Sequence, residues 1–204
     1  MRAAASIISY IFHPLWMPLI IFGLAMWIDP YLIAQRAVIP FITIVLIVNI
    51  LAPAASIWLM VKRGMVGSKE MEARDERFWP FIVVAAYYFI TYWFLRPRTM
   101  ILSEPLVGMF CAVWVALLIT LLINLKWKIS VHMLSQGGMI GCLAALSKVH
   151  FLNAGPLIIL LLLVAGWVGF ARLHLQAHTH AQVYAGFVLG FVVNYAIVGY
   201  GLLI

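Results

Sequence analysis

Long apolar stretches constrain this chain more than any other feature of its sequence. Of its 204 residues, 66% are hydrophobic and only 9% are charged, whereas roughly 25% charged residues are usual in soluble domains. Several apolar stretches reach the roughly 20 residues that a helix needs to cross a bilayer. They show no alternation of apolar and polar residues, so helices are favoured over the strands of a membrane barrel. The sequence therefore predicts an all-α, polytopic transmembrane helical bundle.

Turn-forming and charged residues divide the apolar sequence into predicted helices. Their ranges are 12–28, 38–61, 80–96, 105–125, 133–149, 156–173 and 182–203. The first, fifth and sixth are short for a full crossing, so six spans plus a re-entrant piece is an open alternative. No linker divides the chain, which predicts a single integral membrane domain over 1–204. The N-terminus resembles a signal peptide, but His13, Pro14 and Pro18 interrupt its apolar run, so we expect a retained first span.

The charge and cysteine content indicate which environment the protein occupies and which classes of partner it can bind. The net charge of +7 suits a protein that lies among anionic headgroups or handles an anionic substrate. Basic residues are scattered between the predicted spans, which argues against nucleic acid as a partner. Cys111 and Cys142 lie inside apolar stretches, as packed thiols do. We therefore expect an integral membrane protein, located in a bacterial inner (cytoplasmic) membrane and surrounded by lipid.

The order of the spans predicts that three polar segments share one face of the membrane. The charged run 62–77 follows the second predicted helix, Ser130 and His132 follow the fourth, and the segment 172–182 follows the sixth. An even number of crossings separates each segment from the next. Ionisable residues at the mouths of membrane spans are costly to hold there and often functional. Segments far apart in the chain are thus expected to form one site.

The first segment carries basic residues at helical spacing. As a helix, it would place Lys69 and Arg77 on one side, with Arg74 three residues before Arg77. Glu70 lies four residues before Arg74 and could pair with it. Arginine binds phosphate oxygens through two N–H groups, and lysine adds a point charge. The run is interpreted either as a phosphate clamp or as a solvated interfacial helix with internal ion pairs.

The second segment places a serine and a histidine at the start of an apolar helix. Ser130 can cap this helix, whose N-terminal N–H groups form an anion site. His132 lies in its first turn. The alternative interpretation is a histidine at the membrane interface.

The third segment pairs His178 with Gln182, four residues later. Gln182 can reach one ring nitrogen while the other stays free, as a nucleophilic histidine requires. A histidine-rich interfacial turn is one alternative, and a metal site formed by His174, His178 and His180 is another. No glutamate or cysteine lies nearby to complete a catalytic metal set, so neither a metal nor another cofactor is predicted.

A pair of glycines follows each histidine segment at G-x-x-x-G spacing: Gly137 with Gly141, and Gly186 with Gly190. This spacing lets helices approach closely. Close packing of the two helices would bring His132 and His178 together.

These segments resemble the motifs of the type 2 phosphatidic acid phosphatase superfamily, which are K-x6-R-P, P-S-G-H and S-R-x5-H-x3-D in chain order. Residues 129–132 resemble the second motif, with the proline and the glycine replaced. Residues 171–182 resemble the third, with Ala171 for serine and Gln182 for aspartate. The spacing from Lys69 to Arg77 is one residue longer than in the first motif. The resemblance covers roughly residues 60–195 and leaves out the first two spans.

The resemblance implies a membrane lipid-phosphate phosphatase of the same fold that needs no metal. It implies that His178 attacks phosphorus and forms a phosphohistidine, and that His132 protonates the leaving alkoxide. The phosphoryl oxygens would be held by Lys69, Arg77, Ser130 and Arg172, and Arg74 joins them in the predicted phosphate clamp. Gln182 brings no charge to the nucleophile, and the chain has no carboxylate after Glu104.

The expected substrate is a lipid phosphate or a polyprenyl diphosphate, whose phosphate lies at headgroup level while its tail stays in lipid. Two other functions remain open. One is a catalytically weakened lipid-phosphate binder or scaffold, and the other is a transporter with a histidine-lined path. If every Lys and Arg is counted, their distribution places the face with the three polar segments in the cytoplasm. The resemblance instead implies that this face lies on the outer side of the membrane. The sequence does not indicate an oligomeric state.

Overall fold

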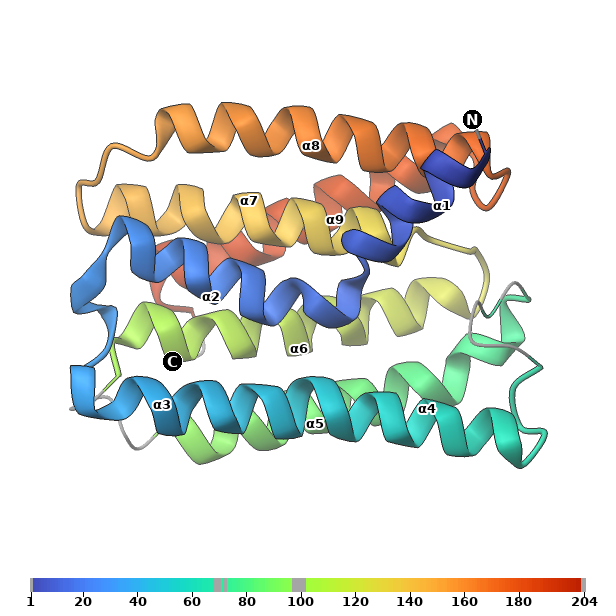
Figure 1. Ribbon diagram of the computed structural model, residues 1–204, viewed down its shortest axis with the longest axis horizontal. Coiled ribbons are helices and arrows are strands. Elements are labelled where there is room, and N and C mark those ends of the chain that lie inside the picture. Colours follow the sequence, from blue (N-terminus) through green and yellow to red (C-terminus); the bar gives the residue numbers. More distant parts are fainter. Residues whose placement is uncertain (1, 68–70, 72, 97–101, 203–204) are drawn as a thin grey trace.

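The computed structural model describes residues 2–67, 71, 73–96 and 102–202, and these residues are mostly helical. The α-helices are α1 (Arg2–Ile11), α2 (Met17–Ile28), α3 (Gln35–Ile44), α4 (Ala52–Lys62), α5 (Phe78–Leu95), α6 (Glu104–Asn124), α7 (Val131–Val149), α8 (Gly155–His174) and α9 (His180–Tyr200). Short 3₁₀ helices cover Pro14–Trp16, Pro30–Leu32 and Asp75–Arg77, and a π-helix covers Val45–Leu51. Figure 1 shows the long helices side by side along the long axis of the molecule.

Six helical segments of the described chain are long and apolar enough to cross a membrane: Arg2–Ile28, Arg36–Lys62, Asp75–Leu95, Glu104–Asn124, Gly155–His174 and His180–Tyr200. Many large apolar and aromatic side chains on these segments are exposed, Trp27, Trp93 and Trp167 among them. Such a surface suits lipid rather than water. The predicted all-α polytopic bundle is confirmed, and the chain is an integral membrane protein.

The first predicted helix, 12–28, is wrong at its start. The N-terminal span begins at Arg2 and breaks at His13, where a 3₁₀ turn (Pro14–Trp16) joins α1 to α2. Proline disfavours the α conformation in the residue before it, and His13 has extended dihedral angles (φ −66°, ψ 137°). The second predicted helix, 38–61, lies within a continuous helical segment from α3 to α4, with the π-helix between them.

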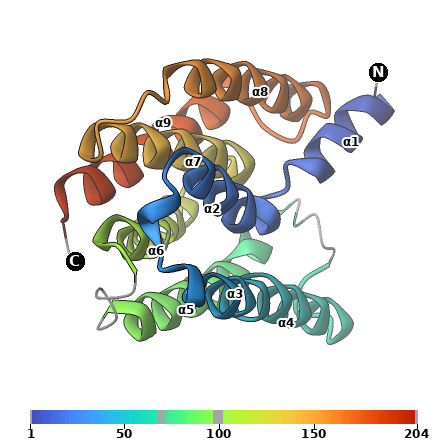
Figure 2. The same cartoon turned by 60° about the vertical axis from the view of Figure 1, so that its left-hand side comes forward.

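Helix α7 is a further long helix that is not among the six apolar segments. It carries more polar residues and glycines than the others, Gln136, Gly137 and Lys148 among them. Figures 1 and 2 show it between α8 and α6, with α2 across it. Most of its side chains are buried, Gln136 among them, so Gln136 faces protein rather than lipid, whereas Lys148 near the end of the helix is exposed.

Helices α7 and α9 form the closest helix pair in the bundle. A Cβ atom at Gly137 would collide with the main-chain oxygen of Phe187, and one at Gly190 would collide with that of Leu134. Gly141 and Gly186 are likewise closed to a side chain by main-chain oxygens of the opposite helix. The close approach predicted from the two G-x-x-x-G pairs is therefore confirmed.

The connections between the helices divide between the two ends of the bundle. Figure 1 shows the α4–α5, α6–α7 and α8–α9 connections at one end, together with the start of α1. We call this the polar end, since it carries the three polar segments 62–77, 125–132 and 172–182. At the opposite end, the carboxylate of Asp29 pairs with Nδ1 of His150 and ties the α2–α3 connection to α7. The three polar segments therefore share one end, as the parity of the spans predicts.

Candidate active site

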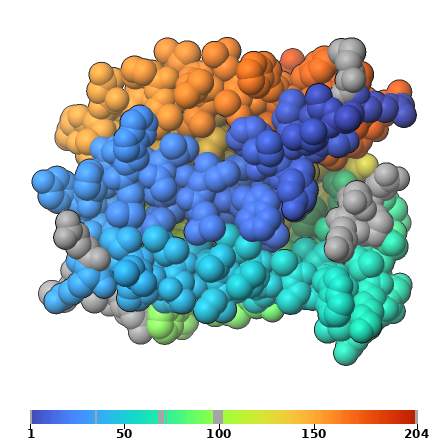
Figure 3. Space-filling view, viewed as in Figure 1, coloured from blue at the N-terminus to red at the C-terminus, as the bar shows by residue number. Residues whose placement is uncertain are grey.

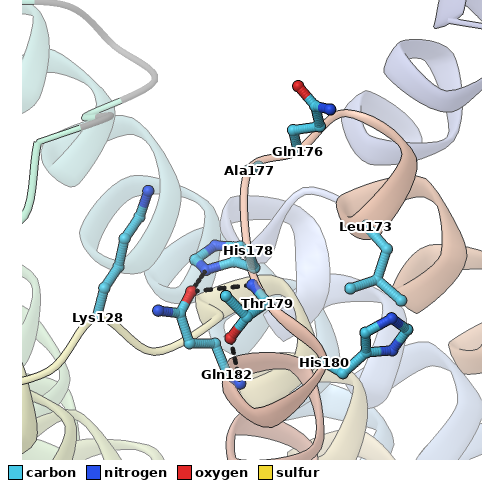
Figure 4. Close-up of a pocket in the computed structure, with 8 residues that line it drawn as sticks. All are labelled: Lys128, Leu173, Gln176, Ala177, His178, Thr179, His180 and Gln182. Carbon is cyan, nitrogen blue, oxygen red and sulfur yellow. Dashed lines mark hydrogen bonds between the residues drawn. The ribbon is translucent and has the colours of Figure 1, made fainter.

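His178 lies in the α8–α9 connection at the polar end, next to the first turn of α9. Its Nδ1 atom lies 3.0 Å from Oε1 of Gln182 (Figure 4). The same oxygen accepts the main-chain N–H of Thr179 at 3.2 Å, and the Thr179 hydroxyl accepts the N–H of Gln182 at 3.4 Å. Together these bonds form a capping box at the start of α9. The pairing of His178 with Gln182 that the spacing predicts is present.

The capping box determines which nitrogen of His178 carries the proton. The main-chain N–H of Thr179 can only donate, so the Gln182 atom that faces it is the amide oxygen. Nδ1 of His178 must then donate to that oxygen in the neutral ring. Nε2 keeps its lone pair and has no hydrogen-bond partner among the described residues. This is the tautomer that a nucleophilic histidine needs.

The surroundings of His178 keep its ring neutral. Burial is the main cause of a lowered His178 pKa of about 3. The hydrogen bond with Gln182 raises this pKa, whereas the positive charges of Arg77, Arg172 and Lys128 lower it. The side chain is only 8% exposed. At neutral pH the residue therefore holds an unprotonated nitrogen within a cluster of cations.

Arg77 joins the start of α5 to the connection before α7. Its guanidinium donates from Nε to the main-chain oxygen of Met71 at 2.9 Å and from Nη1 to that of Ile129 at 3.2 Å. The side chain is 6% exposed, and its charge lies close enough to Arg172 for the two guanidinium groups to repel each other. Arg77 is buried and Arg172 is half-buried, and like charges so placed are unfavourable unless an anion lies between or beside them.

Ser130 and Arg172 each carry a buried polar atom that has no hydrogen-bond partner among the described residues, Oγ and Nε respectively. Buried polar atoms are rarely left unpaired in native proteins. Ser130 occupies the N-cap position of α7, but its hydroxyl does not cap the helix, which corrects that part of the prediction. Its main-chain N–H instead donates to the carbonyl of Gln182 at 3.3 Å, so its backbone is tied to α9.

His132 lies in the first turn of α7, close enough to Arg172 and His178 to interact electrostatically with both. Its Nε2 atom lies 3.1 Å from the main-chain oxygen of Ser9. The ring of His13 packs edge-on against it, with 5.3 Å between the ring centroids and 89° between the planes. From the sequence, His13 is predicted only to interrupt the first apolar run, and neither Ser9 nor His13 is predicted to lie at the site. The His13-Pro14 pair inside an apolar stretch was the available signal for a break there.

Of the two remaining predicted phosphate ligands, Arg74 and Lys69, only Arg74 is described, and it points away from the cluster around His178. The Arg74 side chain is exposed and pairs with Asp75, with 3.1 Å from Nη2 to Oδ1, while its main-chain oxygen accepts from Nδ2 of Asn124. The predicted helix over 69–77 is not seen: the described part contains only the 3₁₀ turn Asp75–Arg77. Lys69 and its neighbour Glu70 lie outside the described residues.

A shallow cavity of about 520 Å³ opens beside His178. It is lined by residues of the α8–α9 connection and one lysine of the α6–α7 connection, namely Lys128, Leu173, Gln176, Ala177, His178, Thr179, His180 and Gln182. Figure 4 shows His178 and Gln182 on the side toward Lys128, and the ring of His180 on the other side of the connection.

The histidines do not assemble a metal site. Over residues 2–67, 71, 73–96 and 102–202, no three side chains of His, Cys, Asp or Glu lie close enough together to hold a metal ion. The alternative metal site formed by His174, His178 and His180 is therefore wrong.

Comparison of the chain with family models, with curated proteins and with solved structures gives no match.

Proposed function

We propose that this protein is a membrane lipid-phosphate phosphatase in which His178 is the nucleophile. One observation carries the proposal. Among the described residues, the neutral imidazole of His178 lies close to three cations and has no partner at Nε2, and Ser130 and Arg172 at the same end hold buried polar atoms without partners. An enzyme that transfers a phosphoryl group through histidine needs such a nucleophile and such donors for the phosphoryl oxygens.

In the proposed reaction, the Nε2 lone pair of His178 attacks phosphorus and the bond from phosphorus to the ester oxygen breaks. His132 enters this step as the imidazolium; the leaving alkoxide takes one of its protons and departs as an alcohol, which leaves the His132 ring neutral. Water then attacks the phosphohistidine and gives a proton to the neutral His132 ring, which releases inorganic phosphate and restores the neutral His178 and the imidazolium of His132. Arg77, Arg172 and Ser130 stabilise the charge that builds on the phosphoryl oxygens.

The position of the site favours a substrate that stays in the bilayer. The polar groups lie at one end of a bundle whose sides are apolar, so the phosphate of a lipid would reach them while its tail remains among the helices and lipid. A lipid phosphomonoester or a polyprenyl diphosphate has this form. The proposed location is a bacterial inner membrane.

Phosphate release from purified protein over a panel of lipid phosphates and polyprenyl diphosphates tests this function. We expect release from at least one substrate, with and without a chelator, and formation of a phosphohistidine that is stable to base and labile to acid. His178→Ala should abolish both, whereas His174→Ala should retain both because His174 stacks on Phe170 outside the cavity. Equal phosphate release by the two variants would rule out His178 as the nucleophile.

A lipid-phosphate binder is the second candidate, and the neutral side chain of Gln182 favours it. Over the part of the chain that the structure describes, no carboxylate is among the groups that influence the charge of His178, although a negative partner would stabilise the imidazolium that forms during turnover. This second candidate predicts that the protein binds vesicles that contain phosphatidic acid, that binding depends on Arg77 and Arg172, and that no phosphate is released.

A further inference from the structure

The break between α1 and α2 sets free a main-chain acceptor at the polar end. In an uninterrupted helix the carbonyl of Ser9 would accept the N–H of His13. Here the N–H of His13 turns to the carbonyl of Tyr10 at 3.3 Å, because Pro14 keeps His13 out of the α conformation. The Ser9 carbonyl is consequently available to a partner outside its own helix.

The Nε2 atom of His132 forms a hydrogen bond of 3.1 Å with that carbonyl oxygen. A carbonyl oxygen only accepts, so Nε2 of His132 carries a proton in this contact. The lone pair of the neutral ring is then on Nδ1. The tautomer of His132 is thus set by α1, just as that of His178 is set by Gln182.

His13 supports the same ring from a second direction. Its own ring is fixed at Nδ1, which accepts the N–H of Leu15 at 3.2 Å and caps the 3₁₀ turn. With that nitrogen held, the imidazole packs perpendicular to His132. Edge-to-face contact of this kind prefers one mutual orientation, so His13 restricts the plane of the His132 ring.

The N-terminal helix is held in place by the rest of the bundle. It packs against α8, whose last turn carries Arg172. Figure 3 shows α1 and α2 lying on one face of the molecule, between α8 and the segment formed by α3 and α4. The carbonyl of Ser9 and the ring of His13 therefore reach His132 from a helix that is itself packed against the site.

We propose that the broken end of α1 is a positioning element for His132: the Ser9 carbonyl and the His13 ring hold that ring by its Nε2 side, in the orientation from which Nδ1, once protonated, gives its proton to the leaving group. The inference rests on the proposed function, because it assigns α1 a part in the step that His132 performs. It makes Pro14 and His13 positioning residues, since neither acts on phosphorus directly.

Leaving-group dependence tests this role, because an ester with an acidic leaving group does not need a general acid. Pro14→Ala should let His13 reclaim the Ser9 carbonyl. It should lower kcat for a lipid alkyl phosphate by about 10- to 100-fold, a share of the 10²–10⁴ that general acids contribute. The kcat for 4-nitrophenyl phosphate should change less than about twofold, and KM should change little for both. Pro40→Ala, which alters a proline inside α3, should leave both rates unchanged.

Two substitutions at His13 separate ring packing from capping. His13→Asn keeps a side chain that can cap the 3₁₀ turn but loses the ring against His132. His13→Phe keeps a ring and loses the cap. We expect His13→Asn to reduce alkyl phosphate hydrolysis more than His13→Phe. The reverse order, or equal losses on both substrates, would mean that His13 only stabilises the fold and would overturn the inference while leaving the proposed function intact.

Nitrogen NMR of ¹⁵N-histidine-labelled protein in detergent gives a readout that does not depend on activity. With His132 assigned from a His132→Gln variant, wild-type protein should show a protonated, hydrogen-bonded Nε2 at that residue, and Pro14→Ala should lose that state. An unchanged His132 signal in Pro14→Ala would refute the positioning role. Absence of phosphate release by wild-type protein on every substrate would instead refute the proposed function, and the catalytic part of this inference with it.

Discussion

The amide oxygen of Gln182 lies 3.0 Å from Nδ1 of His178 and 3.2 Å from the main-chain nitrogen of Thr179. One atom therefore completes the cap of α9 and orients the imidazole beside it. The cap is worth roughly 0.5–2 kcal/mol in helix stability, and here it also determines the ring tautomer. A local device for starting a helix thus prepares a nucleophile, without a carboxylate.

Substitution of Gln182 by glutamate tests whether charge is the missing feature. Gln182→Glu keeps the length of the side chain and the capping box, and adds a negative charge next to His178. We expect kcat for lipid phosphate hydrolysis to rise by about tenfold, because the carboxylate stabilises the imidazolium that forms during turnover. Gln182→Ala should lower kcat, because the ring loses its orienting acceptor. A Gln182→Glu protein slower than wild type would contradict this account.

Lowered pH should destabilise the protein through His178. The folded-state pKa of His178 is about 3, below the ordinary value of about 6.5, so the unfolded chain binds a proton more readily. The stability that neutral His178 contributes is fully present above about pH 6.5 and is lost as the pH falls toward 3. Thermal unfolding in detergent between pH 7.5 and 4 should show this decline. His178→Gln, which cannot titrate, should decline less steeply, and identical slopes would count against a buried neutral imidazole.

Phosphate should stabilise the protein by relieving the repulsion between Arg77 and Arg172. A ligand that binds only the folded state raises its stability by RT ln(1 + [L]/Kd), so the melting temperature should rise with added phosphate or vanadate. Arg172→Met should melt at a higher temperature than wild type without the anion, and should lose the response to phosphate. Sulfate-free buffer with matched ionic strength is the control. A phosphate response retained in Arg172→Met would place the anion elsewhere.

The contact between α7 and α9 should tolerate no side chain at its glycines. Gly190→Ala places a Cβ against the main-chain oxygen of Leu134, and overpacking of this kind typically costs about 1–3 kcal/mol. Phosphate release should fall as well, because the contact sets the distance between His132 and His178. Gly166→Ala is the matched control, since no atom lies within 4 Å of the added Cβ and alanine favours the helix. Equal melting temperatures for the two variants would contradict the close contact.

The sequence predicted most of the long-range arrangement from one-dimensional information. Apolar stretches gave the bundle, and the parity of the spans placed the segments of His132 and His178 at one end. It did not predict the geometry of the first span, because a helix-breaking His13-Pro14 pair inside an apolar stretch is compatible with either a kink or a later helix start. Nor could it place Arg74, because an exposed arginine pairs with whichever carboxylate the local turn offers, here Asp75.

By itself, the sequence determined what depends on spacing along one helix or on apolar length. The bond between His178 and Gln182 follows from a four-residue step, and the α7–α9 approach follows from glycines at the same step. Only the tertiary structure decided that Arg77 binds the carbonyl of Ile129 and that His132 binds the carbonyl of Ser9. Main-chain carbonyls are present at every residue and carry no side-chain signature. Which of them is released to a distant imidazole depends on how separate helices pack.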